Sequence, residues 1–124
     1  MAKKVRDIRW LDAPAAHDYP SALSYLSLVY PATRARALVA KLRRARVTTF
    51  KAKDIFRASA LSSLGVSNTR VEHERKMIAK GTPLSPILLV RDPARGKVVI
   101  ADGYHRLCAI YSYNEDAEVP CQIV

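Results

Sequence analysis

Residues Val98–Tyr111 read VVIADGYHRLCAIY, and they divide into two segments of different character. The first four residues are apolar and mostly β-branched, which is typical of a strand buried on both faces. The apolar residues from Leu107 onward are spaced as in a helix. Asp102 and Gly103 separate the two segments, so we expect a strand, a tight turn and then a helix. The first N–H groups of such a helix lack a partner within it and carry a partial positive charge, which suits a phosphate group.

Each residue of this turn has a chemistry that fits an anion site. Gly103 lets the backbone approach a ligand closely, and the N–H groups of Tyr104–Leu107 can bind phosphate oxygens. Arg106 adds a bidentate contact, and His105 can donate to phosphate or titrate near neutral pH. Asp102 could accept the proton of a substrate hydroxyl, or hold Mg²⁺ together with phosphate oxygens.

A purely structural interpretation of the turn stays open. In it, Asp102 caps the helix, Gly103 serves only a tight turn, and Arg106 pairs with Glu115 or Asp116. Anion binding is the better expectation because His105 and Arg106 stand two and three residues after the glycine, at the positive end of the helix.

The bulk composition narrows the class of protein. The 124 residues fit one domain, and 49% of them are hydrophobic, which predicts a packed core. No apolar run is long enough to span a bilayer, and Met1–Asp7 is not followed by the apolar segment of a signal peptide. Cys108 and Cys121 are too few for a disulfide scaffold and lack metal-ligand spacing. We therefore expect a reduced, cytoplasmic protein without membrane contact.

The charge is unevenly distributed along the chain. Residues 1–81 hold 17 Lys and Arg against 6 Asp and Glu, and the net charge of the whole chain is +10. We expect Thr33 to cap a helix that ends near Ala45, and the face opposite its apolar residues is basic. The basic residues are Arg34, Arg36, Lys41, Arg43 and Arg44, with Arg46 just beyond. This face is either simply solvated or contacts the phosphates of DNA or RNA.

The remaining elements follow from local patterns. An extended arm, 1–19, should pack on the body through Trp10 and Leu11. We expect Lys51–Ala60 to form a helical turn or an irregular segment. Three further helices are expected: Ser21–Tyr30, a helix from a cap at Ser67 or Asn68 to Gly81, and Tyr104–Tyr113. The expected strands are Val47–Phe50, Pro86–Val90, Lys97–Ala101 and Val119–Val124.

Residues 66–124 resemble the ParB/sulfiredoxin superfamily, which includes ParB-like nuclease domains. The resemblance lies in the order of elements around Pro86-Ile87, the Gly96 turn, Asp102–Arg106 and Val119-Pro120. It implies a single α/β (mixed α+β) domain, a small mixed sheet flanked by helices, over 47–124. Residues 1–46 would then form an N-terminal arm and a basic helical extension.

Members of this superfamily differ at the turn. Sulfiredoxins carry Gly-Cys-His-Arg, and Tyr104 stands at the cysteine position here, so the resemblance does not imply a sulfiredoxin reductase. Chromosome-partitioning ParB proteins carry Gly-Glu-Arg-Arg, which binds a nucleoside triphosphate. The turn is most similar to the Asp-Gly-His-His-Arg of archaeal free serine kinases, from which it differs at Tyr104.

These similarities imply roles for further residues. The ligand would be ATP, ADP or CTP, with Mg²⁺ at Asp102, and it would contact Gly103, Tyr104, His105 and Arg106. Arg70 and His73 on the preceding helix would face the same pocket. Asp102, His105 and a glutamate of that helix, Glu72 or Glu74 with Glu74 preferred, would be catalytic.

Three functional hypotheses remain open. The first is a nucleotide-binding domain, active as a phosphotransferase or nucleotidase at the Asp102–Arg106 turn. The second is a DNA- or RNA-binding module that uses the helix of Arg34–Arg46. The third is an interaction protein in which exposed Tyr25, Tyr30 and Tyr113 support a homodimer.

Overall fold

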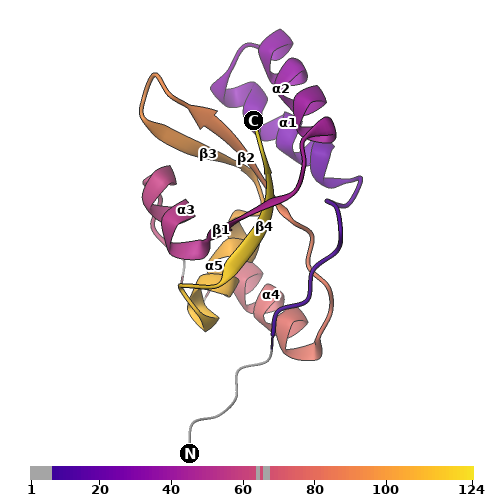
Figure 1. Ribbon diagram of the computed structural model, residues 1–124, viewed down its shortest axis with the longest axis vertical. Helices are drawn as coiled ribbons and strands as arrows, with labels where there is room; N and C mark the ends of the chain where they lie inside the picture. The colour runs from indigo at the N-terminus through magenta and orange to yellow at the C-terminus, as the bar shows by residue number, and fades with distance from the viewer. Residues whose placement is uncertain (1–6, 64, 66–67) are drawn as a thin grey trace, which may run out of the picture.

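A four-stranded sheet organises the chain, with its strands in the order β1-β4-β2-β3 (Figure 1). The computed structural model describes residues 7–63, 65 and 68–124. The strands are Thr48–Lys51 (β1), Ile87–Asp92 (β2), Lys97–Asp102 (β3) and Glu118–Ile123 (β4). The helices are Asp18–Val29 (α1), Ala32–Arg44 (α2), Ala52–Ser59 (α3), Thr69–Lys80 (α4) and Tyr104–Tyr113 (α5). The predicted α/β class with a helical N-terminal region is confirmed.

The sheet is mixed, as the sequence predicts. β2 and β3 form an antiparallel hairpin whose register shifts between Leu88 and Leu89. β1 pairs antiparallel with β4, whereas β4 runs parallel to β2. The parallel pair requires a crossover, and α5 lies in the connection between β3 and β4.

Helices cover both faces of the sheet, because successive side chains of β2 point to opposite sides. Leu88 and Val90 pack with α1 and α2, and Ile87 and Leu89 belong to the core formed with α3, α4 and α5. In Figure 1, α1 and α2 lie together at the upper right, away from α4 and α5. The α1 and α2 helices thus form one of the two helical layers, and a domain boundary at residue 46 stays a prediction.

Several local predictions are confirmed. Asn68 caps α4 by accepting from the N–H groups of Arg70 and Val71, at 3.0 and 3.2 Å. Gly81 ends α4 in the left-handed conformation, with φ of 77°. Ser67, the alternative cap, lies outside the described residues. The hairpin and the bounds of α5 also agree with the prediction.

Other local predictions are wrong. Thr33 lies inside α2, whose N-cap is Pro31 and has no side-chain hydrogen bond. The α1 helix begins at Asp18, so the extended arm is shorter than expected, and residues 1–6 of that arm lie outside the described part. Ala52–Ser59 is a full helix, because Ile55 and Phe56 enter the core.

The arm docks beside α4 through its backbone. Leu84 N–H donates to Arg9 O, and Leu11 N–H donates to Leu84 O, both at 2.8 Å. Trp10 packs against the core, as predicted, but the Leu11 side chain is 41% exposed and does not. The arm thereby fixes where α1 begins, which decides the position of Asp18 described below.

Candidate functional site

The turn between β3 and α5 needs a glycine for two reasons. Gly103 has φ of 106°, a conformation that residues with a Cβ rarely adopt. A Cβ at this position would also lie 2.5 Å from Ile87 Cδ1 and 2.7 Å from Arg106 Nη2. The turn therefore brings the backbone closer to these side chains than any other residue type would permit.

The start of α5 keeps the open end that the sequence predicts, with one difference. The N-cap of α5 is Gly103, which has no side chain, and the Asp102 carboxylate accepts from Arg106 Nη2 at 3.2 Å rather than capping the helix. Leu107 N–H already donates to Gly103 O at 2.9 Å, so this amide does not belong to the expected phosphate-binding group. The three N–H groups before it, from Tyr104 to Arg106, lie ahead of the first helical hydrogen bond.

A cavity of about 460 Å³ opens beside this helix end. Asp102, Gly103, Tyr104 and His105 line it from the turn. The opposite wall comes from α1 and the segment after α3, through Ser21, Tyr25 and Leu61. Two aromatic rings and an imidazole thus border a space that also meets the positive end of α5.

Arg106 does not line this cavity, because carboxylates hold its guanidinium. Its Nη2 lies 3.2 Å from Asp102 Oδ2, and its Nη1 lies 3.6 Å from Asp18 Oδ2. The expected alternative pairing with Glu115 or Asp116 is not formed. Arg106 could contact a phosphate in the large cavity only if it left these partners.

Asp18 is the member of this cluster that sequence reasoning missed. Its side chain is only 3% exposed, and Ser85 Oγ donates a hydrogen bond to its Oδ2. His17 Nε2 lies 3.3 Å from its Oδ1. Asp18 follows a histidine in a stretch without periodicity, so the sequence gives no indication that its side chain is buried. A buried acid is retained here because three donors surround it.

The acid–base properties of the turn depart from those of free side chains. Burial is the largest influence and raises the pKa of Asp102; the charge of Arg106 lowers it, and the charge of nearby Asp18 raises it again. Burial and then the charge of Arg70 lower the pKa of His105, and Glu74 opposes this. Asp102 therefore holds its proton to higher pH than a free aspartate, and His105 loses its proton at lower pH than a free histidine.

The residues expected from α4 are only partly brought to the turn. Glu74 lines a second cavity of about 210 Å³ with His17, Ser85 and Arg106, on another side of the helix end from Asp102. Its Oε2 is buried without a hydrogen-bond partner. Arg70 acts on His105 through its charge but is exposed, and so is His73. Neither residue lines either cavity, contrary to the expectation that both face the pocket of the turn.

The predicted Mg²⁺ position has few protein ligands. Among the described residues, no group of three or more His, Cys, Asp or Glu side chains could hold a metal ion. Asp102 Oδ2 is also engaged by Arg106. A Mg²⁺ ion at Asp102 would therefore take most of its ligands from phosphate oxygens and water.

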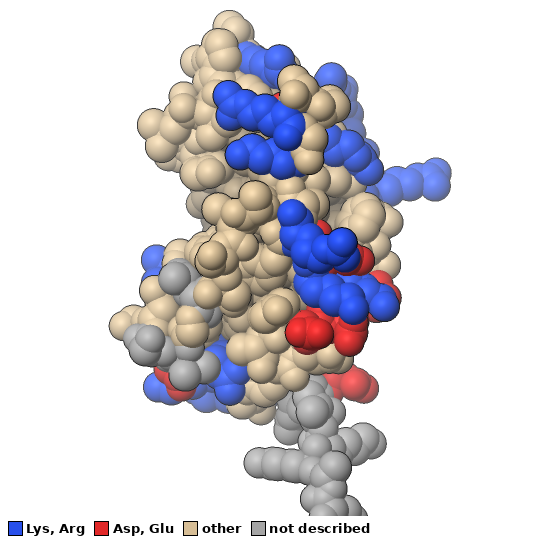
Figure 2. Space-filling model, turned by 90° about the vertical axis from the view of Figure 1, so that its left-hand side faces the viewer, with Lys and Arg blue, Asp and Glu red and all other residues tan. Residues whose placement is uncertain are grey.

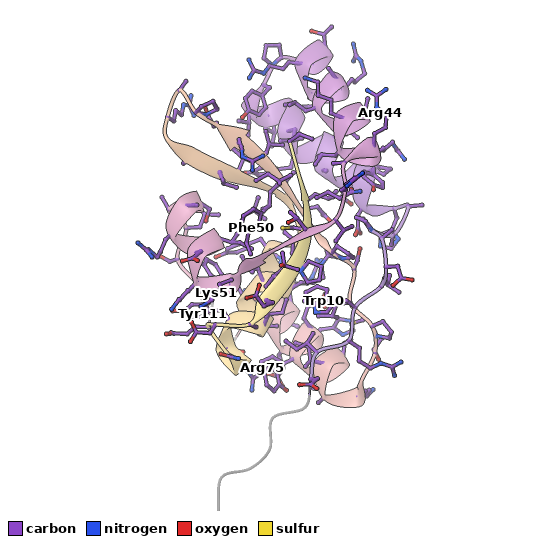
Figure 3. All side chains as sticks on the ribbon, viewed as in Figure 1. Trp10, Arg44, Phe50, Lys51, Arg75 and Tyr111 are labelled. Carbon is purple, nitrogen blue, oxygen red and sulfur yellow. The ribbon has the colours of Figure 1, made fainter. Side chains whose placement is uncertain are left out.

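The basic face of α2 is exposed, as the sequence predicts. Its six residues, Arg34, Arg36, Lys41, Arg43, Arg44 and Arg46, are exposed and form no ion pair within the described part of the chain. Two of them stack on tyrosines, with Arg34 over Tyr30 and Arg43 over Tyr19. Arg44 extends from the outer side of α2, away from the sheet (Figure 3).

The face that carries α3 differs from α2 in its charge pattern. Figure 2 shows basic and acidic side chains next to one another on this face. Lys53 pairs with Asp116 at 2.7 Å, and Arg57 pairs with Asp54 at 3.4 Å. The basic residues of α2 thus differ from those of α3 in having no acidic partner among the described residues.

The tyrosines expected to support a homodimer are not all exposed. Tyr25 is 44% exposed, but Tyr30 and Tyr113 are half-buried. Arg75 stacks on the Tyr113 ring, and the Tyr113 hydroxyl donates to Arg75 O. These three side chains do not form one exposed aromatic surface, so the homodimer stays a prediction without support from them.

No helix in the described part of the chain is both long and apolar enough to cross a membrane. Comparison with models of protein families, with curated proteins and with solved structures gives no match in any of the three.

Proposed function

We propose that the chain is a nucleotide-binding domain, of the ParB/sulfiredoxin type, whose ligand occupies the cavity beside the start of α5. The observation that carries this proposal is the coincidence of that cavity with the N–H groups ahead of the first helical hydrogen bond of α5. Phosphate oxygens would accept from these N–H groups. Tyr25 and Tyr104 supply aromatic walls for a base, as in ATP, ADP or CTP.

The proposal extends to phosphoryl transfer in the reducing cytoplasm, with Asp102 as the general base. Asp102 lines the cavity and has a raised pKa, which makes it a stronger proton acceptor than a free aspartate. It would take the proton of an acceptor hydroxyl while that oxygen attacks the terminal phosphorus and the nucleoside diphosphate leaves. A Mg²⁺ ion bound by the phosphates would neutralise the charge that develops on them. If water is the acceptor, the same arrangement gives a nucleotidase.

A pair of histidine variants tests nucleotide binding. His105 lines the cavity from the first turn of α5, whereas His73 lies on α4 and does not line it. We expect calorimetry to show that His105→Ala weakens ATP, ADP or CTP binding about tenfold, the value of one hydrogen bond to a charged group. His73→Ala should leave the affinity unchanged. Equal effects of the two variants, or a wild type that binds none of the three nucleotides, would refute the proposal.

A second pair separates binding from catalysis. Asp102→Asn should abolish phosphate release or transfer while nucleotide affinity stays within a few-fold of wild type. Arg106→Ala is a poorer test, because it leaves the buried carboxylates of Asp18 and Asp102 without their cation. Retained activity in Asp102→Asn would refute the role of Asp102 as the general base.

Nucleic-acid binding by α2 is a second candidate, favoured by the absence of acidic partners for its basic face within the described residues. Each cation that neutralises a phosphate releases a counterion, so affinity should fall steeply with salt. We expect the slope of log K against log salt to decrease by about 3 when three such arginines are replaced by glutamine. The replaced residues are Arg36, Arg44 and Arg46; the matched control replaces the ion-paired Lys53, Arg57 and Arg95.

The control set removes the same net charge from another face of the molecule. If both triple variants weaken binding to duplex DNA or RNA equally, the interaction depends on net charge and not on α2. If the α2 variant alone loses affinity, the surface is assigned. No change in either variant would remove this candidate.

A further inference from the structure

A further cavity, of about 210 Å³, lies between α3 and the sheet. It shares no lining residue with the two cavities at the start of α5. Each of the four strands contributes an apolar side chain to its floor: Phe50 from β1, Ile123 from β4, Leu89 from β2 and Val98 from β3. The floor is therefore apolar across the whole width of the sheet.

The strand register explains why these side chains meet on one face. Side chains two residues apart on a strand point to the same side, so Arg91 shares a face with Leu89. Val98 lies opposite Arg91 in the β2–β3 hairpin, and Ile123 lies beside Leu89 in the parallel pair. Leu89 and Ile123 belong to the core formed with α3, so this face is the one that α3 covers. Arg91 consequently projects on the same side as the apolar floor.

The α3 helix closes this face only in part. It packs against β3 (Figure 1), and Ile55 and Ala58 line the cavity from its inner side. The eight residues of α3 extend over about 12 Å, and Ala58 offers only a methyl group toward the sheet. Val98 and Ile123 stay half-buried, and the Phe50 side chain is 36% exposed. Apolar surface is thus left open at a position where the core has room for more atoms.

Two charged side chains, Arg91 and Asp54, also line the cavity. Asp54 already has a cation, because Arg57 Nη1 lies 3.4 Å from its Oδ1. The guanidinium of Arg91 forms no ion pair within the described part of the chain, and the residue is exposed. The charge without a partner at the mouth of the cavity is therefore positive.

We propose that this cavity binds an aliphatic carboxylate, with its alkyl chain on the apolar floor and its carboxylate paired with Arg91. A guanidinium matches the two oxygens of a carboxylate, and one arginine balances its single charge. A phosphate monoester carries about 1.5–2 charges and would need more cations than the cavity provides. Pockets for drug-sized ligands have volumes of about 300–1,000 Å³, so a cavity of 210 Å³ suits a smaller molecule. This site is independent of nucleotide binding.

Calorimetry with the full chain tests the ligand class, with octanoate as the probe. Octanoate should bind about tenfold more tightly than hexanoate, because two further methylene groups leave water. Octylammonium has the same chain with the opposite charge and should bind at least tenfold more weakly than octanoate. A wild type that does not bind octanoate, or that binds octylammonium equally well, would overturn the proposal.

A pair of arginine variants tests the assigned head group. Arg91→Gln should weaken octanoate binding about tenfold or more, the value of a hydrogen bond between charged groups. Arg95→Gln removes a cation from the same hairpin, but Arg95 pairs with Asp92 and does not line the cavity. It should leave the affinity unchanged. If the two variants weaken binding equally, the net charge of the protein attracts octanoate and the site is refuted.

A pair of alanine variants tests the assigned cavity. Ala58→Leu fills the space between α3 and the sheet and should abolish octanoate binding. Ala40→Leu makes the same change at an exposed position of α2 and should have no effect. Octanoate binding that persists in a folded Ala58→Leu variant would contradict the proposal.

A measurement on wild type decides the question if Ala58→Leu does not fold. In NMR spectra, octanoate should shift the methyl signals of Ala58 and Val98, which line the cavity. It should leave those of Leu26, which is buried in the other helical layer. Unshifted Ala58 and Val98 signals at saturating octanoate would show that the ligand lies elsewhere and would overturn the assignment.

Discussion

Replacing Gly103 by alanine should destabilise the protein more than the same change at Gly65 or Gly96. At φ of 106° the added Cβ is strained, which costs about 1–2 kcal/mol. It would also lie 2.5 Å from Ile87 Cδ1. Because Ile87 is completely buried, its side chain has no room to move, and such overpacking costs about 1–3 kcal/mol more. The free energy of unfolding should therefore fall by about 2–5 kcal/mol.

Urea denaturation measures this change, and two other glycines separate its causes. With a slope of about 1–3 kcal/mol per M, the midpoint should fall by roughly 1–2 M. Gly96→Ala places a Cβ in open space at φ of 64°, so only the strain of about 1 kcal/mol remains. Gly65→Ala meets nothing within 4 Å and should change stability by less than about 1 kcal/mol. If Gly103→Ala costs no more than Gly96→Ala, the argument from crowding against Ile87 is refuted.

Three further predictions concern single residues. Asn68→Ala should lower the free energy of unfolding by about 1 kcal/mol, because α4 loses the cap of two N–H groups; a thermal melt without a shift would contradict this. Because the pKa of Asp102 is raised, the folded protein binds the proton of this carboxyl group more tightly than the unfolded chain does. The resulting stability is present below the ordinary aspartate pKa and is lost as pH rises through the higher pKa of the folded state. Asp102→Asn should remove that decline from urea unfolding curves measured across acidic pH. Burial raises the pKa of the Cys121 thiol to about 12. A thiol reagent at pH 8 should therefore modify Cys121 only at the rate at which the protein unfolds. Fast modification of the native state would show instead that this thiol is accessible.

Much of the fold could be predicted because its signals are local. Asn68 and Gly81 bracket α4 with a cap and a left-handed stop, and both act on backbone groups within a few residues. The β-branched run ahead of Asp102 indicates a strand, and the glycine after it indicates the turn. The predicted helix cap at Thr33 is wrong because Pro31, two residues earlier, already provides the extended conformation at which α2 begins.

The candidate site could be predicted only where it is continuous in sequence. The β3–α5 turn was found, but the pairing of Asp18 with Ser85 spans 67 residues and has no pattern of its own. The direction of the Arg106 side chain likewise depends on Asp18. The sequence therefore predicts that Arg106 contacts a phosphate, whereas in the structure it pairs with two carboxylates. Long-range contacts of this kind are fixed by how layers stack, which neither spacing nor composition encodes.

The place of β4 in the sheet bears on how the protein is made. β4 is the only neighbour of β1 in the described sheet, and Glu118 follows Lys51 by 67 residues. At about 5–20 residues per second, ribosomes need roughly 3–13 seconds to bridge that gap. Meanwhile the β2–β3 hairpin can close, since its halves are adjacent in the chain. A nascent chain arrested before residue 118 should therefore leave Val47–Lys51 open to proteases and chaperones, and the same segment should become protected once β4 has been synthesised.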